Sequence, residues 1–208
     1  MTRIDHVVLA TSDLELGATK LRAEHGLVSV PGGRHPDFGT SNRLVPMEEQ
    51  YLELAAVTDP ERAASCAFGR AVAALARPGE IGLLAVCLEP SDLEAMAARL
   101  GLPIESGRRT SPDGARVSWR TVGFNQAFSP SRLPFFISWD TGSTHPSHMA
   151  VADRAKSARF TRVELGGDRE QITAWLGAPV PNLVLTGGPP GVHRVEISCG
   201  EAVTVSLP

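Results

Sequence analysis

Cysteine is scarce in this sequence, and basic charge is not in excess. The three cysteines, Cys66, Cys87 and Cys199, are far apart and odd in number. They predict no disulfide framework and favour a reducing compartment, so a cytoplasmic location is expected. The 20 Lys and Arg residues are outnumbered by 23 Asp and Glu residues and form no run. A nucleic-acid partner is therefore not expected.

Long hydrophobic runs are missing as well. No apolar stretch approaches the ~20 residues that cross a bilayer, so no membrane association is expected. The first residues enter a strand pattern at once, without the basic and apolar regions of an export signal. Aromatic residues make up only 5% of the chain, but 42% of its 208 residues are hydrophobic. A chain of this length and composition can bury a sizeable core and reads as a soluble globular protein.

A strand followed by a capped helix occurs twice. The apolar segment Ile4–Ala10 leads into Ser12-Asp13-Leu14-Glu15, which has the form of a capping box with Ser12 as N-cap. The apolar segment Ile81–Leu88 leads into Ser91-Asp92-Leu93-Glu94 in the same way. Each helix should cover one face of a small sheet, so the other face must meet another unit or enclose a cleft.

After each helix the pattern continues with further strands. Strands are expected at 43–46 and 51–57 in the first copy, and at 116–122 and 133–139 in the second. Residues 31–42 are too rich in Gly and Pro for regular structure, so a loop is expected there. A third, shorter copy is expected from a strand at 160–165, a helix start at Asp168, and strands at 183–185, 192–198 and 202–207. This succession places the chain in the α+β class.

His6 and Glu53 are the most informative polar residues. Each lies within an apolar strand pattern, where an imidazole or a carboxylate is costly to bury without a partner. Strand residues alternate between two faces, so Ile4, His6 and Val8 are expected on one face and Glu53 on the face opposite Leu52. If the two strands are neighbours, His6 and Glu53 face the same concave surface. The alternative is a core histidine hydrogen-bonded to Glu53 or to a backbone carbonyl.

Four groups of motifs carry a resemblance to a known family. They are Asp5-His6-Val7-Val8; Gly32-Gly33-Arg34-His35-Pro36 with Gly39-Thr40-Ser41-Asn42; Tyr51-Leu52-Glu53-Leu54; and Leu133-Pro134-Phe135-Phe136-Ile137 with His145-Pro146-Ser147. Together they resemble a glyoxalase-like domain protein of the vicinal oxygen chelate superfamily, which includes glyoxalases, bleomycin resistance proteins and dioxygenases. The resemblance covers most of the chain.

The resemblance implies repeated βαβββ modules whose curled mixed sheets surround a cavity. Residues 1–208 would then form a single glyoxalase-like domain. Its parts would be a first module at 1–58, a connector helix at 59–79, a second module at 80–140 and a C-terminal βα-ββ unit at 158–208. In metal-dependent members of the superfamily, a divalent cation is held in the cavity by about one ligand from each of four strands.

Only half of that ligand set is present. The resemblance assigns His6 and Glu53 as ligands from the first module. Alignment of the two capping boxes places Ala85, which cannot bind a metal, opposite His6, and the fourth position falls at Ser138, a poor ligand. The metal, if one is bound, would be Zn, Fe, Mn or Ni, and Glu53 would also be the catalytic base that moves a proton next to a carbonyl.

Other polar residues are candidates for contact with a substrate. They are His35, Asn42, Arg116, Arg120 and Ser138. Arg116, Ser118 and Arg120 share one strand face and would bind an anionic substrate if that face lines the cavity; otherwise they form an ordinary solvated face. His145 and His148 are expected at the surface, although a loop histidine could complete a two-His, one-carboxylate set with His6 and Glu53.

Two functions are compatible with this set, besides a structural or interaction role with a vestigial cleft, which the presence of His6 and Glu53 disfavours. The first is a divalent-metal-dependent lyase, isomerase or oxygenase acting on a small oxygen-rich molecule through His6 and Glu53. The alternative is a metal-free protein that binds a small molecule without catalysis, as resistance proteins of the superfamily do; Ala85 and Ser138 favour it. The partner expected in both cases is a small-molecule ligand, and a homodimer is expected from base rates alone.

Overall fold

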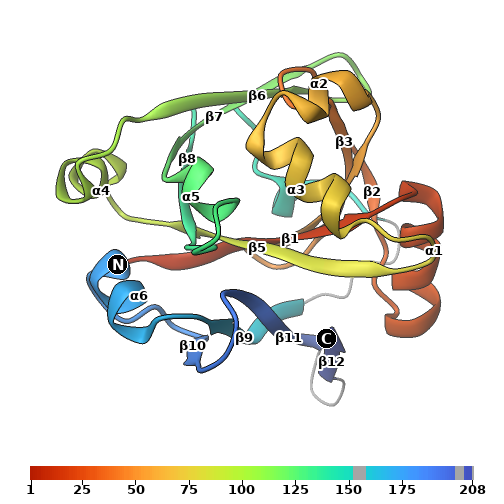
Figure 1. Cartoon of the computed structure of the whole chain (residues 1–208). Helices are drawn as coiled ribbons and strands as arrows, with labels where there is room; N and C mark the ends of the chain where they lie inside the picture. Colours follow the sequence, from red (N-terminus) through yellow and green to blue (C-terminus); the bar gives the residue numbers. More distant parts are fainter. Residues whose placement is uncertain (152–157, 200–203, 208) are drawn as a thin grey trace.

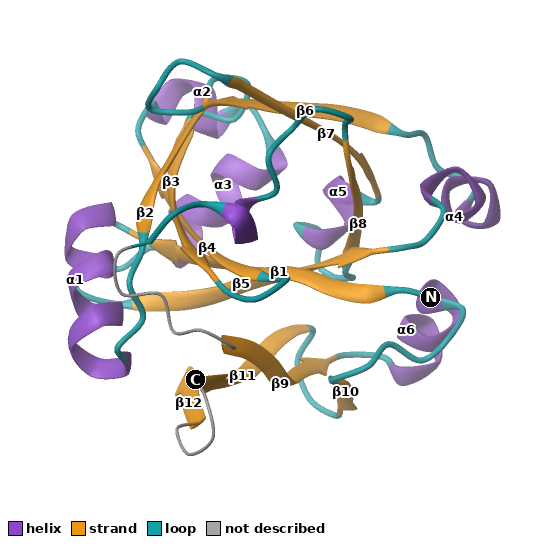
Figure 2. Ribbon diagram, turned by 180° about the vertical axis from the view of Figure 1, so that it is seen from behind, coloured by secondary structure: helices purple, strands orange, loops and turns teal. Residues whose placement is uncertain are grey.

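The computed structural model describes residues 1–151, 158–199 and 204–207. Within them, eight strands form a closed barrel in the order β1-β4-β3-β2-β6-β7-β8-β5, and four strands form a second sheet in the order β10-β9-β11-β12. The barrel encloses a cavity, and helices lie around it and at its openings (Figures 1 and 2). The predicted α+β class, with curled sheets around a cavity, is confirmed.

The order of elements follows the predicted repetition. The first half of the barrel consists of β1 (Arg3–Thr11), α1 (Leu14–His25), β2 (Val30–His35), β3 (Thr40–Pro46) and β4 (Tyr51–Val57). Helices α2 (Pro60–Ala64) and α3 (Ala67–Leu75) connect it to the second half, which consists of β5 (Ile81–Glu89), α4 (Leu93–Leu100), β6 (Glu105–Thr110), β7 (Arg116–Val122), α5 (Phe124–Ala127) and β8 (Phe135–Trp139). The remaining elements are the 3-10 turn η1 (Pro146–His148), β9 (Ala158–Gly166), α6 (Arg169–Leu176), β10 (Leu183–Thr186), β11 (Gly191–Cys199) and β12 (Thr204–Leu207).

The barrel closes at two seams. Strand β1 pairs with β5 in antiparallel orientation, and β2 meets β6 at the pair Arg34–Thr110. At this second seam Gly33 has a φ of 145°, and a Cβ there would lie 2.2 Å from the carbonyl oxygen of Thr110, so only glycine fits. The prediction of a loop at 31–42 is therefore wrong, because most of these residues belong to the hairpin of β2 and β3. Gly33 lies in this hairpin because β2 approaches β6 closely there.

The helix starts differ by one residue from those expected. The N-cap of α1 is Asp13, whose carboxylate accepts hydrogen bonds from the backbone N–H groups of Glu15 and Leu16. Asp92 caps α4, and its carboxylate accepts one hydrogen bond, from the backbone N–H of Ala95. The prediction of Ser12 as N-cap of α1 is wrong. An aspartate caps a helix as well as a serine does, and β1 extends to Thr11, so the helix begins one residue later than predicted. Asp168 caps α6 as predicted.

Helices close the two openings of the barrel. The predicted single connector helix is two helices, because the first ends at Ser65 and Cys66 caps the second.

Helices α3 and α5 cover one opening (Figure 1), and Phe68 of α3 reaches the cavity. The segment around η1 lies at the opposite opening (Figure 2), where Pro146 also lines the cavity.

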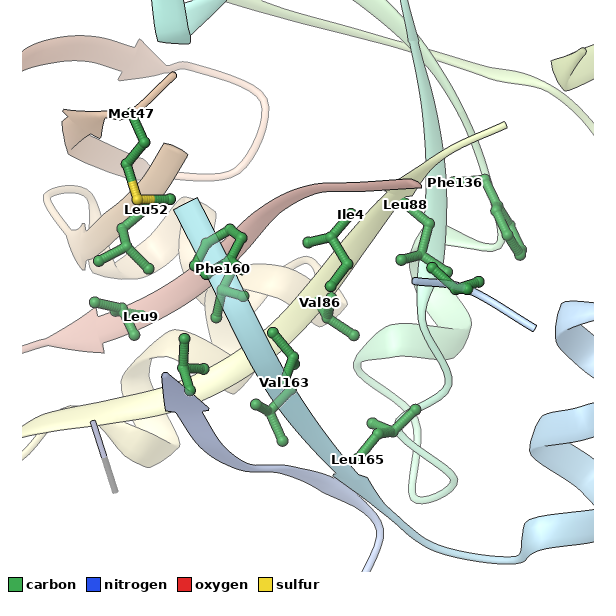
Figure 3. Packing of buried hydrophobic residues seen from close by; sticks show 14 of the residues in the cluster. Ile4, Leu9, Met47, Leu52, Val86, Leu88, Phe136, Phe160, Val163 and Leu165 are labelled. Atoms are coloured by element: carbon green, nitrogen blue, oxygen red, sulfur yellow. The ribbon is translucent and has the colours of Figure 1, made fainter. Parts of the chain in front are cut away.

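The C-terminal sheet packs on the outside of the barrel. Phe160 and Val163 of β9 share one hydrophobic cluster with Ile4 of β1 and with Val86 and Leu88 of β5 (Figure 3). The unit repeats the succession of a strand, a helix and further strands, but β9 pairs in parallel with β10, the strand directly after the helix. In the barrel β1 instead pairs with β4. Residues 202–203 of the last predicted strand and residue 208 lie outside the described residues.

None of the described helices combines the length and the apolar character that crossing a membrane requires.

Candidate functional site

The cavity of the barrel has a polar and an aromatic part. The polar side chains that line it are His6, His35, Asn42, Tyr51, Glu53 and Arg109. The aromatic side chains that line it include Phe38, Phe68, Trp119, Phe124, Phe128, Phe135 and Trp139. Its free volume of about 40 Å³ corresponds to a few waters at ~10–15 Å³ each. In this state the cavity accommodates a small oxygenated group.

A bulge in β1 turns His6 into the cavity. The pairing of β1 with β5 shifts register between Ile4 and His6, so Ile4 packs in the outer cluster with Val7 while His6 and Val8 line the cavity. Ile4 was predicted on the same face as His6, and this is wrong because a bulge breaks the alternation of side chains. The His6 ring stacks on Tyr51, with ring centroids 4.4 Å apart.

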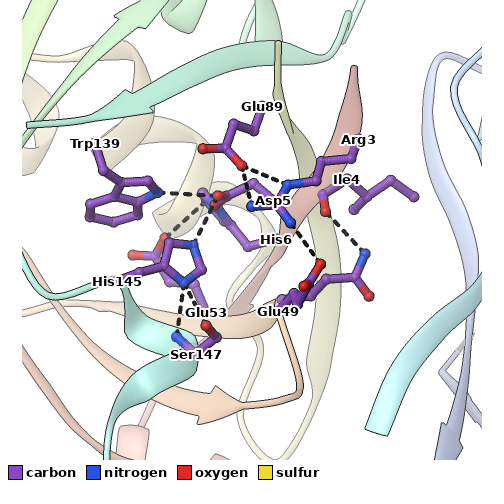
Figure 4. A network of polar contacts seen from close by, with 11 residues as sticks. Arg3, Ile4, Asp5, His6, Glu49, Glu53, Glu89, Trp139, His145 and Ser147 are labelled. Carbon is purple, nitrogen blue, oxygen red and sulfur yellow. Dashed lines mark hydrogen bonds and ion pairs between the residues drawn. The ribbon is translucent and has the colours of Figure 1, made fainter. Parts of the chain in front are cut away.

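Asp5 holds His6 in a fixed orientation. The Asp5 carboxylate is 1% exposed, and its Oδ1 lies 2.5 Å from Nδ1 of His6. Its Oδ2 accepts a hydrogen bond from Nε1 of Trp139 and lies 3.0 Å from Nε2 of His145 (Figure 4). His145 is thus drawn into this network and is not the surface residue that was expected. Because Nδ1 of His6 is engaged by Asp5, its Nε2 is left for the cavity.

Glu53 lies between two histidines. Its Oε2 is 3.7 Å from Nε2 of His6, and its Oε1 is 3.9 Å from Nε2 of His35. Nδ2 of Asn42 donates a hydrogen bond of 2.9 Å to Oε1. His35 is anchored in turn, because its Nδ1 lies 3.2 Å from the Thr40 hydroxyl. The structure therefore brings His6, His35, Asn42 and Glu53 together at one side of the cavity.

Burial and hydrogen bonding set the charge of two groups in this network. Burial alone would raise the pKa of Asp5, but the hydrogen bonds from His145 and His6 outweigh it and lower that pKa well below its ordinary value. Asp5 is thus a carboxylate. Burial lowers the pKa of His35, Glu53 opposes that shift, and Arg109 adds to it. His35 is therefore held as a neutral imidazole, the form that binds metals.

The second half of the barrel offers no equivalent pair. Val8 is paired with Glu53 in the first half, and Cys87 is paired with Phe135 in the second. Alignment of the caps Asp13 and Asp92 matches Val8 to Cys87, and it matches His6 to Ala85. Because Val8 pairs with Glu53 and Cys87 pairs with Phe135, Phe135 is the position equivalent to Glu53. Ser138 was predicted there, and the register corrects it: Phe135, Ile137 and Trp139 line the cavity, and Ser138 does not.

The predicted arginines also lie on the other face of their strand. Trp119 of β7 lines the cavity, whereas Arg116 is exposed and neither Arg116 nor Arg120 is part of the lining. Arg120 forms ion pairs with Glu94 and Asp140 outside the barrel. Both arginines therefore belong to the solvated face that was the alternative, because closure of the barrel directs the Val117–Trp119–Thr121 face inward.

Sequence reasoning missed Asp5 and Arg109. Asp5 was obscured because it precedes His6 in a strand and should point to the opposite face. Arg109 pairs with Val117 across β6 and β7, and its side chain enters the cavity while the neighbouring Arg108 reaches outward to Asp37. The sequence carried no signal for Arg109, because its strand was not predicted and its cross-strand partner Val117 is known only from the structure.

The residues around Glu53 are of the types that bind divalent metal ions. Two ligands of a tetrahedral ion bound at about 2.0–2.1 Å lie roughly 3.3 Å apart. The two histidines face different oxygens of Glu53, at 3.7 and 3.9 Å, and His6, His35 and Glu53 do not form a group whose ligand atoms all lie within 4.8 Å of one another, so all three could bind one ion only after their side chains move. Both imidazoles have Nδ1 engaged and Nε2 directed at the carboxylate, which is the arrangement that supports histidine ligands in metal sites. Two histidines and one carboxylate with open positions form a recurrent catalytic set.

A second cluster is more compact, but its groups are poorer metal ligands. Among the described residues, Asp5, His6 and Cys87 have candidate ligand atoms within 4.8 Å of one another. However, both oxygens of Asp5 already accept hydrogen bonds, and burial together with Asp5 and Glu53 raises the pKa of the Cys87 thiol. A protonated thiol is a poor ligand, so this cluster supports His6 and is not itself a metal centre.

Comparison with known proteins identifies the family of this chain and a solved structure with a similar fold. A family model described as "Glyoxalase-like domain" matches residues 4–180. A hypothetical protein from Staphylococcus aureus is similar in structure, with a TM-score of 0.67 and 18% identity, over 95% of this chain and 81% of that one. No curated protein matches the chain.

Two methylmalonyl-CoA epimerases align more weakly. The one from Streptomyces coelicolor, in complex with 2-nitronate-propionyl-CoA, has a TM-score of 0.47 and 19% identity, over 69% of this chain and 99% of that one. The one from Mycobacterium tuberculosis has a TM-score of 0.46 and 20% identity, over 66% of this chain and 88% of that one.

Proposed function

Because the chain belongs to the glyoxalase-like domain family, we propose that its barrel cavity binds a small oxygen-rich molecule and acts on it through His6 and Glu53. The reaction class is that of a divalent-metal-dependent lyase, isomerase or oxygenase. The fold alone does not choose among these reactions, since all of them occur on this architecture.

The arrangement around Glu53 is the observation that supports this proposal most. One carboxylate lies between two imidazoles, each with its Nδ1 engaged and its Nε2 directed at a different carboxylate oxygen. A purely structural ion pair needs only one such partner. Two imidazoles aimed at one carboxylate inside a cavity are typical of a site that holds an ion or moves a proton.

Each residue has a distinct role in the proposal. His6, His35 and Glu53 would hold the metal, which when bound would supply a Lewis acid that polarises a substrate oxygen. Glu53 takes up or returns a proton next to that oxygen, and Asn42 orients its carboxylate through the hydrogen bond to Oε1. Asp5 fixes the tautomer of His6. The surrounding aromatic rings exclude water from the reacting group.

Metal analysis of the purified chain tests the proposal. We expect stoichiometric Zn, Fe, Mn or Ni in the wild-type protein and in the control His25→Ala, whose histidine lies in the last turn of α1 away from the cavity. His6→Ala, His35→Ala and Glu53→Gln should each lower metal affinity by at least about tenfold, since each removes one of three ligands. Unchanged metal content in these variants, or no uptake by the wild type from any of the four metals, contradicts the proposal.

A metal-free binding protein is the second candidate. The observation that favours it is the second half of the barrel, where Ala85 and Phe135 occupy the positions equivalent to His6 and Glu53. On this alternative, chelator treatment leaves the thermal stability of the protein unchanged, and small oxygenated compounds raise it. On the metal-dependent function, chelator treatment lowers it.

A further inference from the structure

Arg109 is a buried cation within the cavity wall. Its side chain comes from β6, the residue as a whole is only 3% exposed, and it is part of the cavity lining. Its one described hydrogen bond is donated by Nη1 to the backbone carbonyl of Gly32. A guanidinium has five N–H donors, so a single bond to a neutral carbonyl leaves most of them available.

The guanidinium also has no close counter-charge. In the part of the chain that the structure describes, no carboxylate oxygen forms an ion pair with it, and Tyr51, Glu53 and Asp113 act on it only at longer range. Burial lowers the pKa of Arg109 against these three groups. Buried charges are almost always paired because of the cost of removing them from water.

We propose that Arg109 binds a carboxylate, and hence that the ligand of this cavity is a short carboxylic acid with a second oxygen function. The inference deepens the proposed function, because it rests on the cavity being the ligand site, but it does not depend on the metal. The fork of the guanidinium matches a carboxylate through two parallel hydrogen bonds.

The position of Arg109 also orders the ligand. The carboxylate binds at Arg109, and the carbonyl or hydroxyl oxygen next to it faces His6 and Glu53, which line the same small cavity. A free volume of about 40 Å³ admits such an end group.

Thermal stability with matched pairs of small compounds tests this assignment. The probes are acetate, pyruvate and malonate against their neutral amides, with inorganic phosphate as a further arm. At least one carboxylate should raise the melting temperature of the wild type, and its amide should not. Arg109→Gln should weaken carboxylate binding about tenfold to hundredfold, the range for hydrogen bonds to a charged group.

Arg108→Gln is the matched control. Arg108 is the neighbour of Arg109 on β6 and pairs with Asp37 outside the cavity, with its Nε 3.2 Å from Oδ2. This variant should bind the carboxylate like the wild type. Arg109→Lys, which keeps the charge and loses the fork, should fall between the wild type and Arg109→Gln.

Stability without ligand separates this role from a structural one. If Arg109 serves the ligand, Arg109→Met should unfold at the same temperature as the wild type or higher, because an unpaired buried charge is removed. A lower melting temperature of Arg109→Met would assign it a structural role and overturn the inference. Equal stabilisation by acid and amide, stabilisation by phosphate alone, or undiminished carboxylate binding by Arg109→Gln would also overturn it.

The failure of this inference can be told apart from the failure of the proposed function. A wild type that takes up no metal but binds a carboxylate through Arg109 contradicts metal dependence and leaves the Arg109 assignment standing. A wild type that binds metal through His6 and Glu53 but prefers the amide leaves the metal site standing and rejects the carboxylate.

Discussion

Asp5 organises the polar side of the cavity through three side chains. It accepts a hydrogen bond from Trp139 and engages His6 and His145 with its two oxygens. Residues from β1, β8 and the η1 segment are thereby tied to one buried carboxylate (Figure 4). A charge of this kind is stable only with all of its partners present, so it couples the orientation of His6 to the closure of the barrel.

Asp5→Asn should destabilise the protein by about 3 kcal/mol at neutral pH, because the buried hydrogen-bond network loses its charge. The lowered pKa of Asp5 makes its contribution full above the ordinary value of 3.8. The contribution is lost as pH falls below that value, because the unfolded chain then binds a proton that the folded chain does not.

Urea unfolding of the wild type and of Asp5→Asn as a function of pH measures this effect. The difference between the two should shrink in acid. Asp37→Asn is the control at an exposed ion pair and should cost less than about 1 kcal/mol. An Asp5→Asn protein as stable as the wild type would show that the network does not stabilise the fold.

At the scale of elements, the two strand–helix units use the same start signal. The helix N-caps Asp13 and Asp92 follow β1 and β5, and glycine ends both helices in a left-handed conformation. In each unit the helix begins at the leucine that follows the aspartate. The serine before the cap lies outside the helix, so the cap determines where the helix axis begins relative to the barrel.

Asp13→Ala should lower the free energy of unfolding by about 1 kcal/mol, because two backbone N–H groups lose their acceptor. Ser12→Ala should change the free energy of unfolding by only about 0.3 kcal/mol or less. The Ser12 hydroxyl donates to the carbonyl of Arg77 at the surface and not to a group of the helix. Chemical denaturation of both variants measures the difference. A larger loss in Ser12→Ala would assign the cap to Ser12.

At the scale of the whole molecule, the barrel and the C-terminal sheet share one hydrophobic cluster. Phe160 is fully buried, and the cluster includes Ile4 and Val86 from the two strands that form a barrel seam (Figure 3). Backbone hydrogen bonds add to this contact, because Glu48 donates to the carbonyl of Ala158. The outer faces of β1 and β5 are thus buried by the C-terminal sheet, while His6 and Val8 on the inner face of β1 line the cavity.

Phe160→Ala should destabilise the protein by about 3–5 kcal/mol, because it leaves a cavity in this shared cluster. Unfolding should remain a single transition, since the barrel strands lose packing together with the sheet. Calorimetry of the variant, with the exposed-site variant Leu16→Ala as control, measures both quantities. Separate transitions for barrel and sheet would show that the two fold independently.

The sequence by itself determined the local elements and the fold class. Hydrophobic patterns identified β1, β4 and β5, which are apolar over most of their length, and also the C-terminal strands, in which apolar residues are interspersed with polar ones. The same patterns made His6 and Glu53 conspicuous as polar residues in apolar strands. The roles of both residues in metal binding and catalysis stay predictions.

The folded structure was needed to show which strand faces line the cavity and which distant residues meet there. Alternation assigns residues to two faces but does not say which face is inside. Trp119 and Phe135 therefore line the cavity, and the predicted Arg116, Arg120 and Ser138 do not. A bulge that reverses the parity of β1 and the closure of β2 on β6 bring in Asp5, His35 and Arg109. The physical reason is that barrel closure joins residues far apart in the chain, which no local pattern records.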